Sequence, residues 1–350
     1  MGRYRILHVI NWIGDRGSEK TVLNFAKSMD HMDHMFLSKA VLSSEALDSF
    51  MEVGTVVMEE QDPHPGSFNY PTLTDDFVSQ YGVDLVVIYL PGDELPPYVK
   101  NLSCKKVLHV LCAKKCLFDA DGFAAATVPS QYASTLNPHL DPQWVYPVVE
   151  RINPQASKKQ VIQKYFPQAD PDQDYFLISR VGSIETVKHV EDFLRIATAF
   201  RHVENMLFLV AGMGDQNYVN RLFSQYSAPN LVYAGRISEQ EKADINASST
   251  VCLYPTEFEA FGFSLAEPMS HGCPVVTYNE SACPETVGDG GIVVGFNDLP
   301  ALAKQLVEVI TRPALRAKLG EQARQRWHRN FTQDVYVAKM EEIYEKVLND

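Results

Sequence analysis

The sequence has no long hydrophobic run and no excess of basic residues. No apolar stretch in its 350 residues approaches the roughly 20 residues that a membrane-spanning helix needs. Lys and Arg total 31 against 44 Asp and Glu, which gives a formal net charge of −13. Proteins that bind nucleic acid usually carry a basic footprint, because neutralising phosphates supplies much of their affinity. We therefore expect no nucleic-acid partner and no strong membrane anchor.

A local basic cluster is the exception to this acidic balance. Lys105, Lys106, Lys114 and Lys115 lie close together in the chain. We interpret them as the solvated flank of a strand rather than as a patch for a membrane or polyanion.

Cysteine motifs are also missing. The six cysteines form no CxxC pair and have no histidine at zinc-finger spacing, so the pattern indicates neither a disulfide framework nor a zinc site. Free thiols suit a reducing compartment. The apolar run Ile6–Ile10 is too short for a signal peptide and is typical of a first strand. We expect a cytoplasmic protein.

Short apolar runs alternate with longer amphipathic ones, which predicts α/β domains with parallel sheets. The expected strands of the first half are Arg5–Ile10, Met35–Leu42, Thr55–Met58, Asp84–Tyr89, Lys106–Leu111, Gly122–Val128 and Trp144–Val149, and its helices are Ser18–Met29, Tyr70–Tyr81 and Ser130–Leu136. After a proline-containing break the alternation restarts, with expected strands at Tyr175–Ser179, Met206–Ala211, Leu231–Ala234, Thr250–Tyr254, Pro274–Thr277 and Ile292–Val294. Expected helices there are Lys188–Phe200, Asn217–Tyr226, Glu239–Ala247, Phe263–His271, Leu299–Thr311 and Leu315–Trp327.

The break divides the chain into two predicted Rossmann-like domains, residues 1–148 and 149–332. A final helix over residues 333–350 carries apolar residues at helical spacing. We expect this helix to cross back to the N-terminal domain.

The segment from Glu259 to Glu267 carries the strongest chemical signal. It lies where a predicted strand ends and a predicted helix begins, so the backbone N–H groups of residues 261–264 can face an anionic or hydroxylated ligand. Glu259 precedes the helix, and Glu267 is expected in its first turn, where it can accept from a vicinal diol. Two carboxylates beside free amides suit a nucleotide sugar. In the alternative, Ser264 and Glu267 form a capping box and Glu259 is an ordinary loop acid.

The same segment resembles the E-x7-E signature of the retaining glycosyltransferase family 4. The sequence reads Glu259-Ala-Phe-Gly-Phe-Ser-Leu-Ala-Glu267 and continues to Gly272-Cys-Pro-Val-Val276. Weaker similarities to family elements lie elsewhere in the chain, at Arg180, Lys188-His189-Val190-Glu191, Ala211–Asp215, Gly235-Arg236-Ile237, Arg16–Lys20, Leu108-His109-Val110 and Thr127–Ser130. The resemblance implies a GT-B architecture, in which two Rossmann-like domains face a cleft.

The resemblance also implies a role for each matching residue. Glu259 and the amides of Phe261, Gly262, Phe263 and Ser264 would hold the transferred sugar and the distal phosphate. Glu267 would bind the ribose hydroxyls, and Arg180 and Lys188 would neutralise the diphosphate. Ile237 would contact the base. Gly17 would let the first-domain loop approach the phosphates closely, and His109 would contact the donor sugar.

Each of these residues also has an ordinary structural interpretation. Arg180 and Lys188 could be surface cations, His109 a satisfied core histidine, and Gly17 a helix-entry glycine. For Gly212 and Gly214 we favour tight-turn packing over a phosphate-binding role.

Three departures from the family pattern are visible. Arg16 replaces the first glycine of the loop after the first strand, the interval from Arg180 to Lys188 is longer than usual, and His189 replaces the glycine after the lysine. The Asp119-Ala-Asp121 sequence is similar to a metal-binding D-x-D motif, but we interpret it as structural and expect no essential metal or other cofactor.

These observations predict a retaining hexosyltransferase that moves a sugar from a nucleotide-sugar donor, with UDP as the first expectation, to a saccharide or small-molecule acceptor. Residues 149–332 would hold the donor and residues 1–148 the acceptor. Two alternatives stay open: a sugar-nucleotide epimerase of the same fold, and a non-catalytic protein that binds sugar nucleotides.

Overall fold

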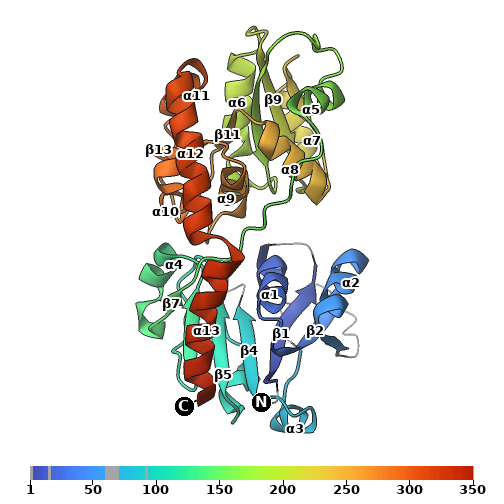
Figure 1. Ribbon diagram of the computed structural model, residues 1–350, viewed down its shortest axis with the longest axis vertical. Coiled ribbons are helices and arrows are strands. Elements are labelled where there is room, and N and C mark those ends of the chain that lie inside the picture. The colour runs from blue at the N-terminus through green and yellow to red at the C-terminus, as the bar shows by residue number, and fades with distance from the viewer. Residues whose placement is uncertain (1–2, 15–16, 60–70, 91–93, 350) are drawn as a thin grey trace. The chain divides into compact units, whose positions relative to one another are not determined.

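The chain folds into two compact units (Figure 1). The computed structural model describes residues 3–14, 17–59, 71–90 and 94–349. Unit 1 combines Met1–Val148 with Gln333–Asp350, and unit 2 comprises Val149–Thr332. Each unit contains one sheet of parallel strands, so the prediction of two Rossmann-like α/β domains is confirmed.

Unit 1 is built on a seven-stranded sheet in the order β3-β2-β1-β4-β5-β6-β7. Its strands are β1 (Arg5–Ile13), β2 (Asp33–Val41), β3 (Thr55–Met58), β4 (Leu85–Leu90), β5 (Lys106–Val110), β6 (Ala125–Val128) and β7 (Gln143–Trp144). Its helical elements are α1 (Gly17–Ser28), α2 (Ser44–Val53), α3 (Asp75–Gln80), η1 (Pro97–Asn101), α4 (Gln131–Leu136) and η2 (Pro138–Leu140). The central strand β4 is buried along its whole length, as expected for a parallel sheet covered on both faces.

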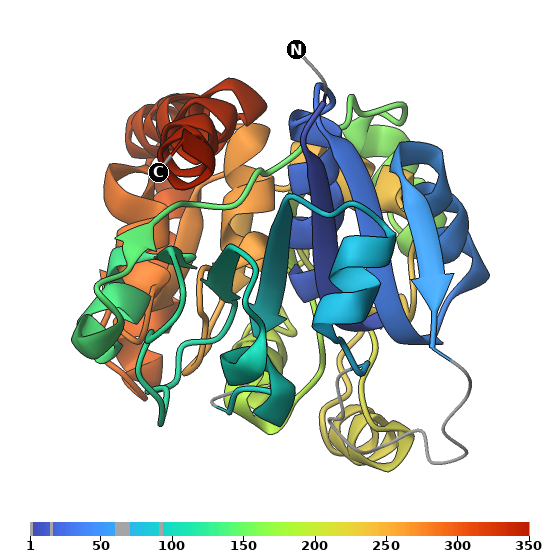
Figure 2. The ribbon, with the colours of Figure 1, turned by 90° about the horizontal axis from the view of Figure 1, so that it is seen from below.

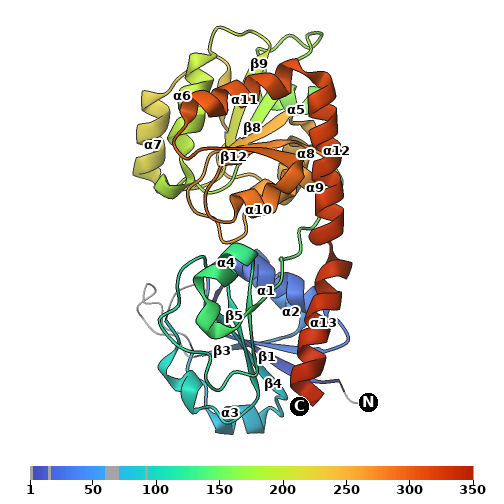
Figure 3. The ribbon, with the colours of Figure 1, turned by 90° about the vertical axis from the view of Figure 1, so that its left-hand side faces the viewer.

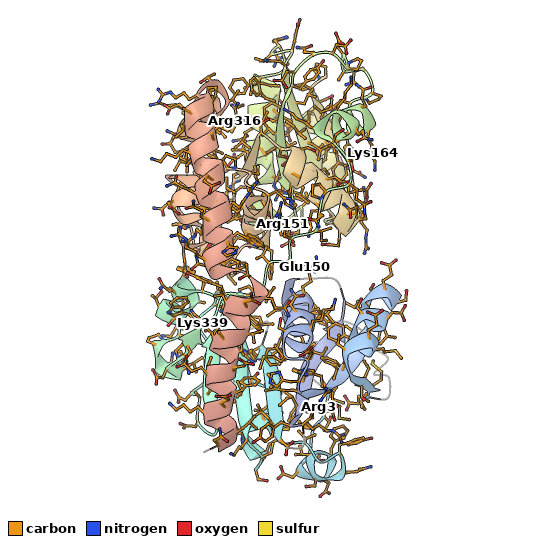
Figure 4. All side chains as sticks on the ribbon, in the orientation of Figure 1. Arg3, Glu150, Arg151, Lys164, Arg316 and Lys339 are labelled. Atoms are coloured by element: carbon orange, nitrogen blue, oxygen red, sulfur yellow. The ribbon has the colours of Figure 1, made fainter. Side chains whose placement is uncertain are left out.

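The last helix, α13 (Gln333–Asn349), belongs to unit 1, and Figure 2 shows it in dark red beside the C-terminus. Its apolar face joins the core formed by β1, β4 and α1, through the buried residues Tyr336, Met340, Ile343, Tyr344 and Val347. Lys339, marked in Figure 4, places Nζ 3.8 Å from the centre of the Trp144 ring. The apolar spacing of this segment therefore reflects packing against a sheet.

Two lysines of the basic cluster have structural partners. Lys105 Nζ donates to the carbonyl oxygens of Val347 and Leu348, at 3.0 and 3.1 Å, and so satisfies the C-terminal end of α13. Lys106 is buried, and its Nζ donates to the carbonyl of Leu102. The interpretation of a solvated strand flank is therefore wrong for Lys106, whose ammonium is held by a backbone carbonyl inside the unit.

Unit 2 is built on a six-stranded sheet in the order β10-β9-β8-β11-β12-β13. Its strands are β8 (Phe176–Val181), β9 (Met206–Ala211), β10 (Leu231–Tyr233), β11 (Val251–Tyr254), β12 (Val275–Tyr278) and β13 (Gly291–Val294). Its helical elements are α5 (Lys158–Tyr165), η3 (Thr186–Lys188), α6 (Val190–Ala199), α7 (Gln216–Gln225), α8 (Glu239–Ser248), α9 (Phe263–Ser270), α10 (Cys283–Val287), η4 (Gly288–Gly290), α11 (Leu299–Thr311) and α12 (Pro313–Asn330).

Helices cover both faces of this second sheet (Figure 3). One hydrophobic cluster joins α6, α7 and α11 to the strands, and another joins α5 and α8 to β8 and β9. Arg316 of α12, marked in Figure 4, donates to the carbonyl oxygens of Val309 and Ile310 at the end of α11. This contact ties the two C-terminal helices of the unit together.

Several element predictions differ from the structure. Helices α2, α5 and α10 were not expected, although Ser157 and Gln160 at the start of α5 form a capping box that the sequence does contain. The strand expected over Trp144–Val149 is only the two-residue β7, because the N–H of Val149 bonds to the carbonyl of Phe331 instead of to a strand. Within the described residues, no helix is long and apolar enough to cross a membrane.

Candidate functional site

Most of the predicted site residues lie at one edge of the unit 2 sheet. Strands β8 and β11 are neighbours in that sheet. Arg180 lies near the carboxyl end of β8, and Tyr254 ends β11. Ligands of open parallel sheets bind outside the carboxyl ends of the strands. The sheet order thus brings together residues that are more than 70 positions apart in the chain.

Lys188 and Glu259 form a nearly buried ion pair at this edge. Lys188 Nζ lies 2.7 Å from Glu259 Oε1 and also donates to the carbonyl of Phe258 at 2.6 Å. The two side chains are only 14% and 12% exposed. Burial lowers the pKa of Lys188, but attraction by Glu259 outweighs it, so the net pKa is raised. Because the N–H of Glu259 donates to Ser281 Oγ at 2.8 Å, this acid is fixed at both backbone and side chain.

Arg180 is fully buried and has no carboxylate partner among the described residues. Its NH2 group donates to the carbonyl oxygens of Ser183 and Lys188, at 3.0 and 3.3 Å. Its guanidinium lies 4.6 Å from the centre of the Tyr254 ring. Within the described chain, Nε and NH1 have no hydrogen-bond partner. Buried charged groups are usually paired, so these two donors lack the partner that their burial calls for.

The N-terminus of α9 provides further donors close to Glu259. Gly262 precedes the helix with a φ of 95°, a conformation that favours glycine. The N–H groups of Phe263 and Ser264 open the helix and have no acceptor within it. Phe261 is buried, and its ring packs edge-on against Phe263 and Phe331. Phe261 therefore anchors the turn that presents the amides of Phe263 and Ser264.

Glu267 is held by a lysine that the motif does not contain. Lys242 of α8 places Nζ 2.5 Å from Glu267 Oε1 and 2.8 Å from Glu239 Oε2. The capping-box alternative is wrong, because α9 is capped by Gly262 with no side-chain bond and the Glu267 carboxylate faces Lys242. Glu267 is also the fifth helical residue rather than a member of the first turn, since α9 begins at Phe263.

Ile237 lies directly before Ser238, the N-cap residue of α8. Its half-buried side chain packs against the cluster that joins α5 and α8 to the sheet. This contact places Ile237 in the loop after β10, and its contact with a nucleotide base stays a prediction.

The glycines at this edge are explained by close backbone packing. A Cβ on Gly212 would lie 1.9 Å from the carbonyl oxygen of Gly182, and one on Gly214 would lie 2.1 Å from that of Ile184. Both contacts are far too short for a side chain. The tight-turn interpretation of Gly212 and Gly214 is therefore confirmed.

His109 lies in unit 1 as a buried residue with both ring nitrogens occupied. Its Nδ1 contacts Thr127 Oγ1, and its Nε2 lies 2.7 Å from Tyr344 Oη. Burial lowers the pKa of His109 to about 3. This environment matches the alternative of a satisfied core histidine. A contact with the donor sugar stays a prediction, and it would require one of these two hydrogen bonds to open.

The loop after β1 is described only in part. Gly17 is the first residue of α1, which matches a helix-entry glycine, and its approach to phosphates stays a prediction. Arg16 lies outside the described residues.

Metal and disulfide chemistry receive no support from the described side chains. Asp119 and Asp121 are both exposed, and no group of three or more His, Cys, Asp or Glu in the described ranges is arranged to hold a metal ion. All six cysteines are free thiols, and five of them are buried. The expectation of free thiols is therefore confirmed.

Sequence reasoning missed three residues of this site. Tyr254 supports Arg180, Ser281 fixes the backbone of Glu259, and Lys242 holds Glu267. Tyr254 ends the strand that leads into the motif, five residues before Glu259, so its position offered a signal. Lys242 lies on α8 and Ser281 in the turn before α10, and neither has a sequence signal. Only the packing of α8 and of this turn beside the motif brings them near.

The family comparison agrees with this geometry. Residues 161–326 match the family model described as "Glycosyl transferases group 1". That range contains Arg180, Lys188, Glu259 and Glu267, so the family match covers the candidate site. The resemblance drawn from the E-x7-E motif is confirmed.

Curated relatives are similar over parts of the chain. "N-acetyl-alpha-D-glucosaminyl L-malate synthase" of Bacillus anthracis is 26% identical over 220 residues, which is 61% of this chain and 56% of that protein. "MMP alpha-(1->4)-mannosyltransferase" of Mycolicibacterium hassiacum is 27% identical over 146 residues, which is 41% of this chain and 36% of that protein. The matched regions thus span about half or less of these relatives.

Solved structures share the fold over the whole chain. A glycosyltransferase from Rickettsia africae has a TM-score of 0.76 at 16% identity, with complete coverage of both chains. Anabaena Alr3699/HepE, solved in complex with UDP-glucose, has a TM-score of 0.75 at 13% identity and covers 97% of this chain and 99% of its own. At such low identity the likeness shows the fold alone, and that fold is the GT-B fold expected from the sequence.

Proposed function

We propose that this protein is a retaining glycosyltransferase that moves a hexose-type sugar from a nucleotide-sugar donor to a saccharide or small-molecule acceptor. The observation that carries the proposal is Arg180, a buried guanidinium with two unused donors, beside the Lys188–Glu259 pair and the N-terminus of α9. The group 1 family match over the same residues supports it. UDP is the first donor nucleotide to test, because a structural neighbour was solved in complex with UDP-glucose.

The proposed chemistry follows from the charge that develops at the donor. When the sugar–phosphate bond breaks, negative charge builds on the departing nucleoside diphosphate. Lys188, the unused donors of Arg180 and the amides of Phe263 and Ser264 are fixed groups that would stabilise that charge in the transition state. Glu259 would accept hydrogen bonds from sugar hydroxyls while its other oxygen stays paired with Lys188.

Glu267 would bind the ribose hydroxyls at the far side of the same site, and Ile237 would border the base. Unit 2 would then hold the donor and unit 1 the acceptor. None of these steps needs a metal ion, and we expect activity in the presence of a chelator. Six free thiols are consistent with a cytoplasmic location.

The first experiment screens UDP-, GDP- and ADP-sugars by thermal shift, since a ligand that binds the native state raises the Tm. The stabilising donor is then incubated with candidate acceptors, and the anomeric configuration of the product is read by NMR. Transfer with retention supports the proposal. Conversion of the donor without an acceptor would indicate an epimerase, and binding without any reaction would indicate a non-catalytic protein.

Site variants then test the assignment. We expect Lys188→Ala and Glu259→Ala each to lower kcat by roughly 100-fold or more, as loss of a fixed charge-stabilising group usually does. The matched controls are Lys318→Ala and Glu204→Gln, which alter exposed residues of unit 2 and should leave kcat unchanged. Near wild-type turnover in Glu259→Ala would show that the site is misassigned.

A further inference from the structure

His189 has a strained backbone beside the proposed donor site. It directly follows Lys188 and adopts the left-handed conformation, with φ 42° and ψ 41°. This conformation costs an ordinary residue roughly 1 kcal/mol, and the resembling family usually has glycine here. Strain of this kind persists where the surrounding structure holds the residue in place.

The imidazole of His189 lies between two carboxylates on different elements. Nδ1 is 3.4 Å from Asp192 Oδ2, in the first turn of α6, and Nε2 is 3.4 Å from Glu257 Oε2, in the loop after β11. The ring also packs edge-on against Tyr278 and Phe296, with centroids 5.9 and 5.2 Å away. The side chain is 21% exposed.

Asp192 is itself fixed by neighbouring residues. Tyr278 Oη donates to Asp192 Oδ2 at 2.8 Å, and Arg195 NH1 lies 3.8 Å from Asp192 Oδ1. Glu257 is half-exposed, and its Oε2 contacts His189 Nε2. The histidine ring thus lies between a rigid acid on the helix and an acid on the loop, with Nε2 in hydrogen-bond contact with Glu257 and Nδ1 facing Asp192.

The loop held by His189 is the loop that carries Glu259. The N–H of Glu257 donates to the carbonyl of Val187 at 2.9 Å, and Lys188 Nζ reaches both Phe258 and Glu259. Two neighbouring residues of one turn, Lys188 and His189, therefore bind two acids of the facing loop. The Lys188–Glu259 contact is part of the proposed donor site, and the His189–Glu257 contact holds the same loop at a point away from the donor.

We propose that His189 is a positioning residue, whose bridge from Asp192 to Glu257 holds the 256–259 loop against the Lys188 turn and so sets the diphosphate-binding geometry of Lys188 and Glu259. This inference rests on the proposed function and adds to it. His189 touches no reacting group. Where the family usually has a flexible glycine, this chain has a side chain that contacts acids on two elements.

The test compares the binding of a nucleoside diphosphate with that of its nucleoside. Isothermal titration is carried out with UDP, GDP and ADP and with uridine, guanosine and adenosine on wild type and His189→Gly. Glycine accepts the left-handed backbone without strain, so the variant removes the ring without straining the turn. We expect the affinity for the bound diphosphate to fall about tenfold, the usual size for a hydrogen bond to a charged group, and that for the matching nucleoside to change less than about twofold.

Two further variants separate positioning from folding. Glu257→Gln should reproduce the loss of diphosphate affinity. The double variant His189→Gly/Glu257→Gln should bind the diphosphate as tightly as either single variant, because both substitutions remove the same contact. His189→Asn, which tolerates the left-handed backbone and keeps a donor, should recover part of the affinity. His202→Gly, at an exposed turn elsewhere in unit 2, is the control.

The outcomes are distinct from those of the proposed function. If wild type binds none of the three diphosphates, the proposed function fails. If wild type binds one and His189→Gly binds it equally tightly, or loses nucleoside and diphosphate affinity by the same factor, the positioning role is overturned.

Discussion

Lys242 Nζ of α8 lies 2.5 Å from Glu267 Oε1 of α9, although the two residues are 25 positions apart. Both side chains are more than four-fifths buried. Burial lowers the pKa of Lys242, but the attraction of Glu267 and Glu239 outweighs it and the net pKa is raised. The contact with Lys242 therefore fixes the orientation of the second glutamate of the E-x7-E motif.

Changing Glu267 should affect donor binding more than turnover. In Glu267→Ala we expect the donor KM to rise by about tenfold, with kcat within about threefold of wild type, as when binding shared by ground and transition states is lost. Lys242→Met should shift KM in the same direction, since it frees the carboxylate without removing it. Steady-state kinetics with varied donor provide the measurement. A fall in kcat at unchanged KM would contradict the ribose-binding role.

Gly212→Ala should destabilise unit 2 strongly. The new Cβ would lie 1.9 Å from the carbonyl oxygen of Gly182, at a φ of 138°. Gly235→Ala is the matched control, because Gly235 also has a positive φ of 67° but a Cβ there would meet nothing within 4 Å. We expect Gly235→Ala to cost about 1 kcal/mol, from strain alone, and Gly212→Ala clearly more. Urea unfolding of both variants measures the difference, and equal losses would refute the packing explanation.

Tyr344→Phe should weaken the attachment of α13 within unit 1. The hydroxyl of Tyr344 forms a 2.7 Å hydrogen bond with His109 Nε2, and both residues are buried. Removing it leaves a buried ring nitrogen unpaired, which costs about 1–3 kcal/mol. Tyr336→Phe, on the same helix, is the control, because the described residues show no hydrogen bond to the Tyr336 hydroxyl. The free energy of unfolding should fall for Tyr344→Phe and stay nearly constant for Tyr336→Phe.

Unit 1 should lose stability in mild acid. His34 Nε2 donates to the carbonyl of Met29, so its Nδ1 accepts from His8 Nε2, and His8 Nδ1 accepts from Tyr89. This chain requires neutral rings. Burial lowers the pKa of His8, His34 and His109, the last to about 3.

The sign of the pH effect follows from these lowered values. Below pH 6.5, the ordinary histidine value, the unfolded chain takes up protons that the native state refuses. Each such histidine then costs about 1.4 kcal/mol of stability per pH unit, and for His109 this continues down to a pH of about 3. Urea unfolding between pH 7.5 and 4.5 should show a loss that begins near 6.5. His139→Gln, at an exposed position, should leave the slope unchanged, and a flat profile to pH 4.5 would disprove the neutral network.

Local pattern determined most strands and helices of this protein, but not all of them. β3 and α11 were predicted with their observed bounds, since a run of β-branched residues and helical spacing are properties of neighbouring residues. α5 was missed in a polar segment despite its capping box, because only two of its side chains are buried and the apolar spacing is weak. α10 was missed because its five residues are too few to show a helical spacing.

For the site, the sequence by itself determined that Glu259 and Glu267 flank a strand-to-helix turn with free amides, because that arrangement depends on a few adjacent residues. Only the tertiary structure decided that Lys188 pairs with Glu259, that Lys242 holds Glu267, and that Arg180 is buried without a carboxylate. These contacts join residues 25 to about 70 positions apart, and they follow from the order of parallel strands. Strand order is set by how crossover helices pack on the two faces of the sheet, and no local pattern records it.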